Sequence, residues 1–144
     1  MSNEAVFAAL ANVRRSLAQL ARVPSAASSG AAGAIQALIG EQFARGTDPY
    51  GAGWQALAES TVRRKGGDDR ILIRTGDMMS GVSVQPMSGA GISITFEQDY
   101  SAYHQVGTGR MPARPVLPDQ RGLPDSWREA IAEAVRAKGE EAMR

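Results

Sequence analysis

The two segments VSVQP (residues 82–86) and GISITFEQ (residues 91–98) constrain the fold of this chain more than any other feature of its sequence. Both alternate apolar with polar side chains, and only the four residues MSGA separate them. Since successive side chains of a strand point to opposite faces, the pattern predicts a β-hairpin with one buried face. Residues 71–74 form a further short β-like run, so we expect the strands of the protein within residues 71–98.

Three amphipathic helices are expected around this hairpin. Residues 3–22 place apolar side chains at steps of three and four, and the same periodicity returns in residues 31–44 and 125–141. The segment VPSAASSG (residues 23–30) is expected to separate the first two helices, because it contains proline, serines and glycine. The order predicts the α+β class, with a small antiparallel sheet packed against N-terminal and C-terminal helices in a single domain of residues 1–144.

The composition excludes several kinds of function. The chain has no cysteine, which excludes disulfides, thiolate nucleophiles and cysteine-ligated zinc, and fits assembly in a reducing cytoplasm. Its 16 basic and 15 acidic residues give a net charge of +1, so the chain as a whole is not expected to coat nucleic acid or bind a membrane surface. We recognise neither a signal peptide nor an apolar run long enough to cross a membrane, and expect a soluble protein.

One basic stretch breaks this charge balance. Such a stretch can bind phosphates through nonspecific electrostatics, but an exposed helix end followed by a turn is the interpretation we favour. No aromatic residue lies within it to stack on bases, and Asp68 and Asp69 are interpreted as a solvated turn rather than a metal site. Its local charge of +3 comes from these two aspartates and five basic residues: Arg63, Arg64, Lys65, Arg70 and Arg74.

The only histidine, His104, lies in YSAYHQVGTGRMPARP (residues 100–115). A catalytic or metal-binding histidine would need partners, and only carboxylates remain in a chain with one histidine and no cysteine. GTGRMPAR also lacks the glycine spacing and the Gly-Lys-Ser/Thr end of a phosphate-binding loop. We therefore expect no enzyme, no metal site and no cofactor, an imidazole bonded to a backbone carbonyl, and Trp54 and Trp127 as core anchors.

Three segments taken together resemble the phage virion morphogenesis family, the tail-completion group of Mu-like and related contractile-tailed phages. They are GAGWQALAESTVRRK, ILIRTGDMMSGVSV and YSAYHQVGTGRMPARPVL, and they follow the family in order and spacing between residues 51 and 118. The chain departs from the family pattern at Met78, Ser101 and Val116. The matching positions are Trp54, Thr61, Leu72, Thr75, Gly76, Tyr100, His104, Gln105, Gly107, Pro112, Ala113, Arg114 and Pro115.

The resemblance implies a structural protein of the phage neck, assembled in the bacterial host cytoplasm and located in the virion. Its subunits are expected to form a ring, commonly a hexamer, that caps the tail tube as a tail terminator and joins the tail to the head connector. A head-completion (stopper) protein of the connector is the alternative within the same class. A small nucleic-acid-binding protein that uses residues 63–74 is an alternative from another class, and a hydrolase that uses His104 is the least favoured.

The matching residues are interpreted as docking elements of such a ring. Residues 100–118 are expected to form a rigid docking loop, because the Gly-Thr-Gly bend and the Pro-Ala-Arg-Pro segment fix its backbone. Arg114 is expected to meet a carboxylate of an adjacent subunit, so Arg114→Ala would weaken assembly and leave the subunit folded. The basic stretch would line the lumen through which duplex DNA passes or face an acidic partner ring, and a neighbouring subunit would cover the edges of the sheet.

Overall fold

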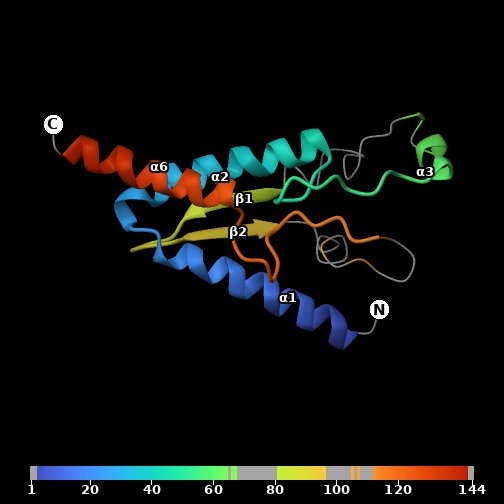
Figure 1. The fold of residues 1–144 in the computed structure, drawn as a ribbon, viewed down its shortest axis with the longest axis horizontal. Helices are drawn as coiled ribbons and strands as arrows, with labels where there is room; N and C mark the ends of the chain where they lie inside the picture. The colour runs from blue at the N-terminus through green and yellow to red at the C-terminus, as the bar shows by residue number, and fades with distance from the viewer. Residues whose placement is uncertain are drawn as a thin grey trace.

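The computed structural model describes residues 3–64, 66–67, 81–96, 105, 107 and 112–142. These residues have the predicted α+β class, and the order of their elements is visible in Figure 1. The helices are α1 (Asn3–Leu17), continued by the 3-10 helix η1 (Ala18–Arg22), α2 (Ser25–Arg45), α3 (Glu59–Arg64) and α6 (Asp125–Ala142). The strands are β1 (Val82–Pro86) and β2 (Ile92–Phe96). The expected run at residues 71–74 lies outside the described residues.

β1 and β2 form the antiparallel hairpin that the alternating pattern predicts. Val84 pairs with Ile94, in the register that also joins Val82 to Phe96. Val82, Val84 and Ile92 are buried, because alternate residues of the two strands face the helices. The period of two in the sequence therefore identified both the strands and their buried face.

Gly91 allows the turn of the hairpin to lie directly on the end of η1. Its N–H donates to the carbonyl of Val23 over 3.0 Å. Its φ of +95° is in the left-handed region, and a Cβ at this position would lie 3.0 Å from the Cα of Ala21. Glycine meets both demands, since it has no Cβ and adopts positive φ readily.

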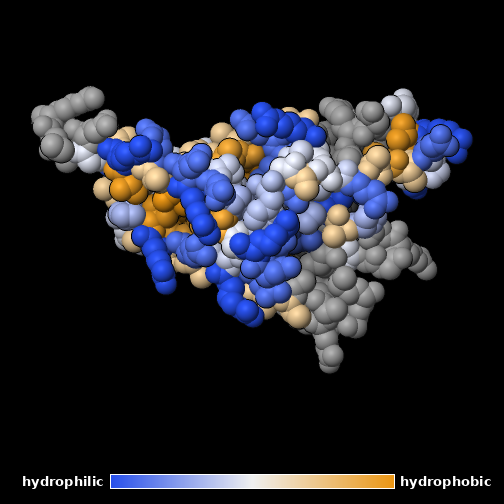
Figure 2. All heavy atoms as spheres, in the orientation of Figure 1, coloured by the Kyte–Doolittle hydropathy of each residue, from blue (hydrophilic) through white to orange (hydrophobic). Residues whose placement is uncertain are grey.

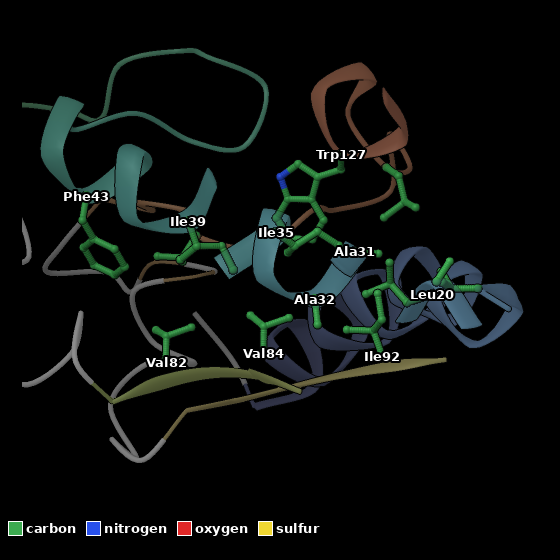
Figure 3. Packing of buried hydrophobic residues seen from close by; sticks show 14 of the residues in the cluster. Leu20, Ala31, Ala32, Ile35, Ile39, Phe43, Val82, Val84, Ile92 and Trp127 are labelled. Carbon is green, nitrogen blue, oxygen red and sulfur yellow. The ribbon is translucent and has the colours of Figure 1, made fainter. Parts of the chain in front are cut away.

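α2 is the centre of the described structure, with the hairpin on one side and α6 on the other (Figures 1 and 3). Small side chains at Ala31 and Ala32 alternate with Ile35, Ile39 and Phe43 along its buried faces. Gly30 lies where a Cβ would come 3.6 Å from the Cβ of Ala134 on α6, so the two helices approach closely. The alanine-rich composition of α2 thus permits it to pack against neighbours on two sides.

Gln36 of α2 covers the backbone of β1. Its Nε2 donates to the carbonyl of Val82 over 3.2 Å, and its Oε1 accepts the N–H of Val84 over 2.9 Å. A side-chain amide of the same subunit therefore takes the place of a neighbouring strand at these two groups of β1. We expected a second subunit to cover the edges of the sheet, and this edge is one of them.

The prediction that residues 23–30 separate the first two helices is wrong for most of that segment. The break is confined to Val23 and Pro24, and α2 begins at Ser25 rather than near residue 31. Proline immediately before the first turn costs no intrahelical hydrogen bond. Ala27 and Ser28 are buried, so packing of the first turns outweighs the weak helix propensity of the serines.

The predicted packing of the sheet against the C-terminal helix also needs correction. α6 packs chiefly against α2, and the hairpin packs chiefly against the other side of α2. Trp127 of α6 is fully buried in this contact and lies over Ile35 in Figure 3. The N-terminal half of the chain thus supplies the cover for the sheet, whereas α6 forms an outer layer.

α3 stands apart from this packed region. It lies at the end of the molecule opposite the C-terminus in Figure 1, and none of its residues is buried. Figure 2 shows hydrophilic and hydrophobic atoms side by side at this end. None of the described helices is both long and apolar enough for a membrane span.

Candidate functional site

Gln105 fixes the backbone of residues 112–118, which we call the proline-rich segment. Its Oε1 accepts the N–H groups of Val116 and Leu117, each over 2.9 Å, and its Nε2 donates to the carbonyl of Leu117 over 2.8 Å. An amide side chain has both an acceptor and a donor, which these three contacts use together. Gln105 therefore holds an extended segment in the way that a paired strand would.

Two further side chains hold the same segment from the opposite side. The buried Gln42 of α2 donates from Nε2 to the carbonyl of Val116 over 2.8 Å. Trp54 donates from Nε1 to the carbonyl of Pro115 over 2.8 Å, and its ring meets Phe43 edge to face with centroids 5.8 Å apart. Hydrogen bonds to buried carbonyls in these directions leave the segment little freedom to move.

Arg114, which we expected to meet a carboxylate of an adjacent subunit, is buried in its own subunit and bonded there to backbone carbonyls. Its exposed fraction is 7%, and its guanidinium donates from Nε to the carbonyl of Gln55 over 2.9 Å and from Nη2 to that of Ala56 over 3.2 Å. Burial lowers the pKa of the guanidinium from its ordinary value. The guanidinium group of Arg114 therefore joins the proline-rich segment to the residues that lead into α3.

A second cluster joins the turn after α2 to residues 119–122. The Tyr50 hydroxyl accepts the N–H of Asp119 over 3.0 Å and lies 2.5 Å from the carbonyl of Gly122. Arg121 forms a double hydrogen bond with the Asp119 carboxylate, at 2.9 and 3.0 Å, and stacks 3.7 Å from the centroid of the Tyr50 ring. Asp48 lies 3.7 Å from Arg121 and its Oδ1 accepts the N–H groups of Tyr50 and Ala52.

The pKa values in this cluster follow from these contacts. The hydrogen bond from Arg121 lowers the pKa of Asp119, because it favours the ionised carboxylate. Burial raises the pKa of Tyr50. The sequence analysis does not identify this cluster, since Tyr50 and Asp119 are 69 positions apart. The pair Asp48-Pro49, which is typical of a turn, is a sequence signal in this part of the chain.

Four of the residues expected to act in docking belong to one internal framework. We call Trp54, Gln105, Arg114 and Pro115 the motif framework, because each contributes a side chain or carbonyl to the contacts above. Gly107 is buried with φ of +76°, and Pro112 is partly buried. Thr61, Arg63 and Arg64 lie on α3, where Thr61 accepts a hydrogen bond from Arg64 over 3.3 Å. The positions outside the described residues are Lys65, Arg70, Leu72, Arg74, Thr75, Gly76, Tyr100 and His104.

A groove lies between α2 and α6 beside the motif framework. One pocket of about 410 Å³ is bordered by the end of α2, the turn after it and the first turn of α6. A second hollow extends along the two helices and shares Leu38, Glu41 and Ser126 with the first. We call the two together the α2–α6 groove.

The four residues of the motif framework are among those on which the family resemblance rests. Trp54 of this framework meets Phe43, so the contacts of the motif extend into α2. A family that shared only these motif segments would account for residues 51–118 and not for the helices on either side of them. The sequence model of the phage virion morphogenesis family matches residues 2–138 of the 144. The chain belongs to the phage virion morphogenesis family.

The family match extends the resemblance from about half of the chain to nearly all of it. α1, α2 and most of α6 thus lie within the residues that the family model matches. Comparisons with curated proteins and with solved structures give no match. Among the residues that the structure describes, no three histidine or acidic side chains are grouped so that they could hold a metal ion.

Proposed function

We propose that this protein is a tail-completion subunit that assembles into a ring, ends the tail tube as its terminator and joins the tail to the head connector. Membership of the phage virion morphogenesis family carries the proposal, since the family is a structural one and its model covers residues 2–138. The family match supports a role in virion assembly, and the position in the neck is our inference.

The motif framework supports a structural role for the matching residues. Its side chains are used in hydrogen bonds to backbone carbonyls and N–H groups at distances of 2.8 to 3.2 Å. Such bonds define one backbone shape and leave no side chain of the framework aimed at a substrate. A subunit that must meet identical neighbours in a closed ring needs surfaces of fixed shape.

α3 supports the same proposal from the surface of the molecule. The framework positions residues 55–56 through Arg114, and the chain then leaves the packed region to form α3. An exposed helix that follows this anchored stretch suits contact with another molecule. Arg63 and Arg64 in its last turn make that contact suited to a partner of negative charge.

Assembly on tail tubes tests the proposed function. The mass of the purified protein is measured by light scattering over a concentration series, alone and with tubes that were assembled without it. A ring-sized species, in solution or only at one end of the tubes in electron micrographs, is the expected result. A subunit that ignores the tubes and binds isolated head connectors would identify a stopper. Salt-dependent binding of the isolated subunit to generic duplex DNA, with no ring in any condition, would favour the nucleic-acid-binding alternative.

A further inference from the structure

The α2–α6 groove carries an excess of negative charge. Five carboxylates line it, against the guanidinium groups of Arg45 and Arg136, and one of the five, Asp48, already lies 3.7 Å from Arg121 of its own subunit. Arg136 is itself paired with Glu133 over 2.9 Å at the surface, and such an exposed pair contributes little. The floor contains small side chains that permit close approach of another chain, namely Ala34, Ala37 and Ala130. The five carboxylates belong to Glu41, Asp48, Asp125, Glu129 and Glu133.

One buried donor in the groove has no acceptor. The side chain of Trp127 is fully buried and borders the pocket, and its Nε1–H has no hydrogen-bond partner among the described residues. In Figure 3 the six-membered ring lies toward Ile35, and the nitrogen lies on the side of the loop that follows α2. Buried N–H groups are almost always paired in folded proteins, so an acceptor that enters the pocket would complete the one hydrogen bond that this side chain lacks.

The charge and form of α3 complement this groove. α3 ends in two exposed arginines, and residues 63–74 carry five basic against two acidic residues. Val62 lies between the basic residues and the start of α3 and is only partly buried, so the helix also offers an apolar contact. A basic helix with no buried residue and an acidic groove with an unpaired donor complement each other.

We propose that the α3 arm of one subunit, Glu59–Arg64, docks into the α2–α6 groove of a second copy of the chain. The arginines of the arm face the carboxylates of the groove, and a backbone carbonyl of the arm accepts the Trp127 Nε1–H. The contact is heterologous, because the arm and the groove lie at different places on the subunit, and repetition of such a contact forms a ring when the rotation from one subunit to the next closes on itself. This inference rests on the proposed function and names the surfaces by which the subunits join.

Cysteine pairs test the contact directly, because the chain has no cysteine of its own. Ser60 on α3, Ser126 at the groove and Ser88 in the hairpin turn are all exposed, so each accepts a cysteine with little change in size. Ser60→Cys subunits are mixed with Ser126→Cys subunits on tail tubes and treated with a short bismaleimide. Since each chain carries one cysteine, a product of two different chains shows contact between subunits.

The expected result is a covalent dimer of Ser60→Cys with Ser126→Cys, and little product when Ser88→Cys replaces Ser126→Cys. An equal or greater yield with Ser88→Cys, from a parent that forms rings on the same tubes, would overturn the docking contact and leave the proposed function standing. A parent that forms no ring in solution or on tubes would overturn the proposed function itself.

Charge exchange gives a second readout. Arg63→Glu with Arg64→Glu should weaken ring formation at least tenfold, and Glu129→Arg with Glu133→Arg should do the same. The combination of all four substitutions should restore much of the assembly, because the two charges are exchanged across one contact. The matched control is Arg14→Glu with Arg15→Glu, which makes the same change of charge at exposed positions of α1. Equal loss in the control, or no recovery in the combination, contradicts the proposal.

Discussion

The guanidinium Nε of Arg114 donates to the carbonyl oxygen of Gln55 over 2.9 Å, which joins two parts of the chain 59 positions apart. Arg114 precedes Pro115 in the motif framework, and Gln55 begins the connection to α3. The contact therefore determines where α3 leaves the packed region. An arginine that we expected to meet a neighbouring subunit thus holds together two parts of its own subunit.

Arg114→Ala should destabilise the isolated subunit. The variant removes two hydrogen bonds from a charged donor and leaves the carbonyls of Gln55 and Ala56 without it, at a cost of about 2–3 kcal/mol in the free energy of unfolding. Urea denaturation of the parent and the variant measures this cost. Arg114→Lys is the matched control, and it should recover only part of the loss because a single ammonium cannot reproduce the planar fork. An unchanged urea midpoint with defective assembly would restore the original docking role.

Gln105→Ala should loosen the proline-rich segment. The variant removes three hydrogen bonds to Val116 and Leu117, so we expect a loss of about 1–3 kcal/mol and faster hydrogen exchange at these two amides. Exchange measured by NMR or mass spectrometry tests this. Gln120→Ala, at an exposed position close by, should change neither quantity. Unchanged protection of Val116 in Gln105→Ala would show that Gln42 and Trp54 hold the segment without Gln105.

Gly91→Ala should destabilise the subunit more than Gly89→Ala does. Both glycines have positive φ, +95° and +92°, so both variants place alanine in an unfavourable conformation at about 1–2 kcal/mol. Only at Gly91 would the added Cβ meet a backbone, 3.0 Å from the Cα of Ala21. Thermal unfolding measures the melting temperatures of the two variants. Since both variants share the cost of positive φ, the difference between their melting temperatures reports the cost of the Cβ contact at Gly91. Equal melting temperatures would contradict the close approach of the hairpin turn to η1.

Asp119→Asn should reduce stability at neutral pH and have a smaller effect in acid. Hydrogen bonds from Arg121 lower the pKa of Asp119 in the folded subunit, so its contribution is present above the unfolded pKa and disappears as the pH falls through the folded value. Because Arg121 is half exposed, the contribution is about 1 kcal/mol or less. Urea denaturation at pH 7 and at pH 3 should show that the difference between parent and variant shrinks in acid. A difference that grows in acid would contradict this assignment.

Trp127→Phe should separate assembly from folding. It removes an N–H that has no partner in the described part of the subunit and keeps most of the buried ring, so the loss of stability should be about 1 kcal/mol or less. Ring formation should weaken, because the acceptor on the incoming arm loses its donor. Trp127→Ala is the comparison, and it should cost about 3–5 kcal/mol through the cavity that it leaves. Parent-like assembly by Trp127→Phe would remove the indole N–H from the proposed contact.

The elements that could be predicted from the sequence are those specified by nearby residues. The hairpin follows from alternation within residues 82–98, and the C-terminal helix from the spacing of Trp127 and Ile131. The family could be identified because its motif is a fixed order of residue types, and the family match confirms that identification. The start of α2 could not be predicted, because serines that weaken a helix in isolation are compensated by burial of Ala27 and Ser28 against other elements.

The sequence by itself determined the two strands, the apolar faces of the helices, the absence of cysteine chemistry and the family, because all of these depend on residue type and short-range spacing. Only the tertiary structure decided that Arg114 is an internal donor, that Tyr50, Asp119 and Arg121 form one cluster, and that α2 lies between the hairpin and α6. Each depends on contacts between residues dozens of positions apart, and neither propensity nor periodicity records which distant carbonyl a side chain will reach. The unpaired Nε1–H of Trp127 belongs to the same class, since a missing partner is visible only after every neighbour has been placed.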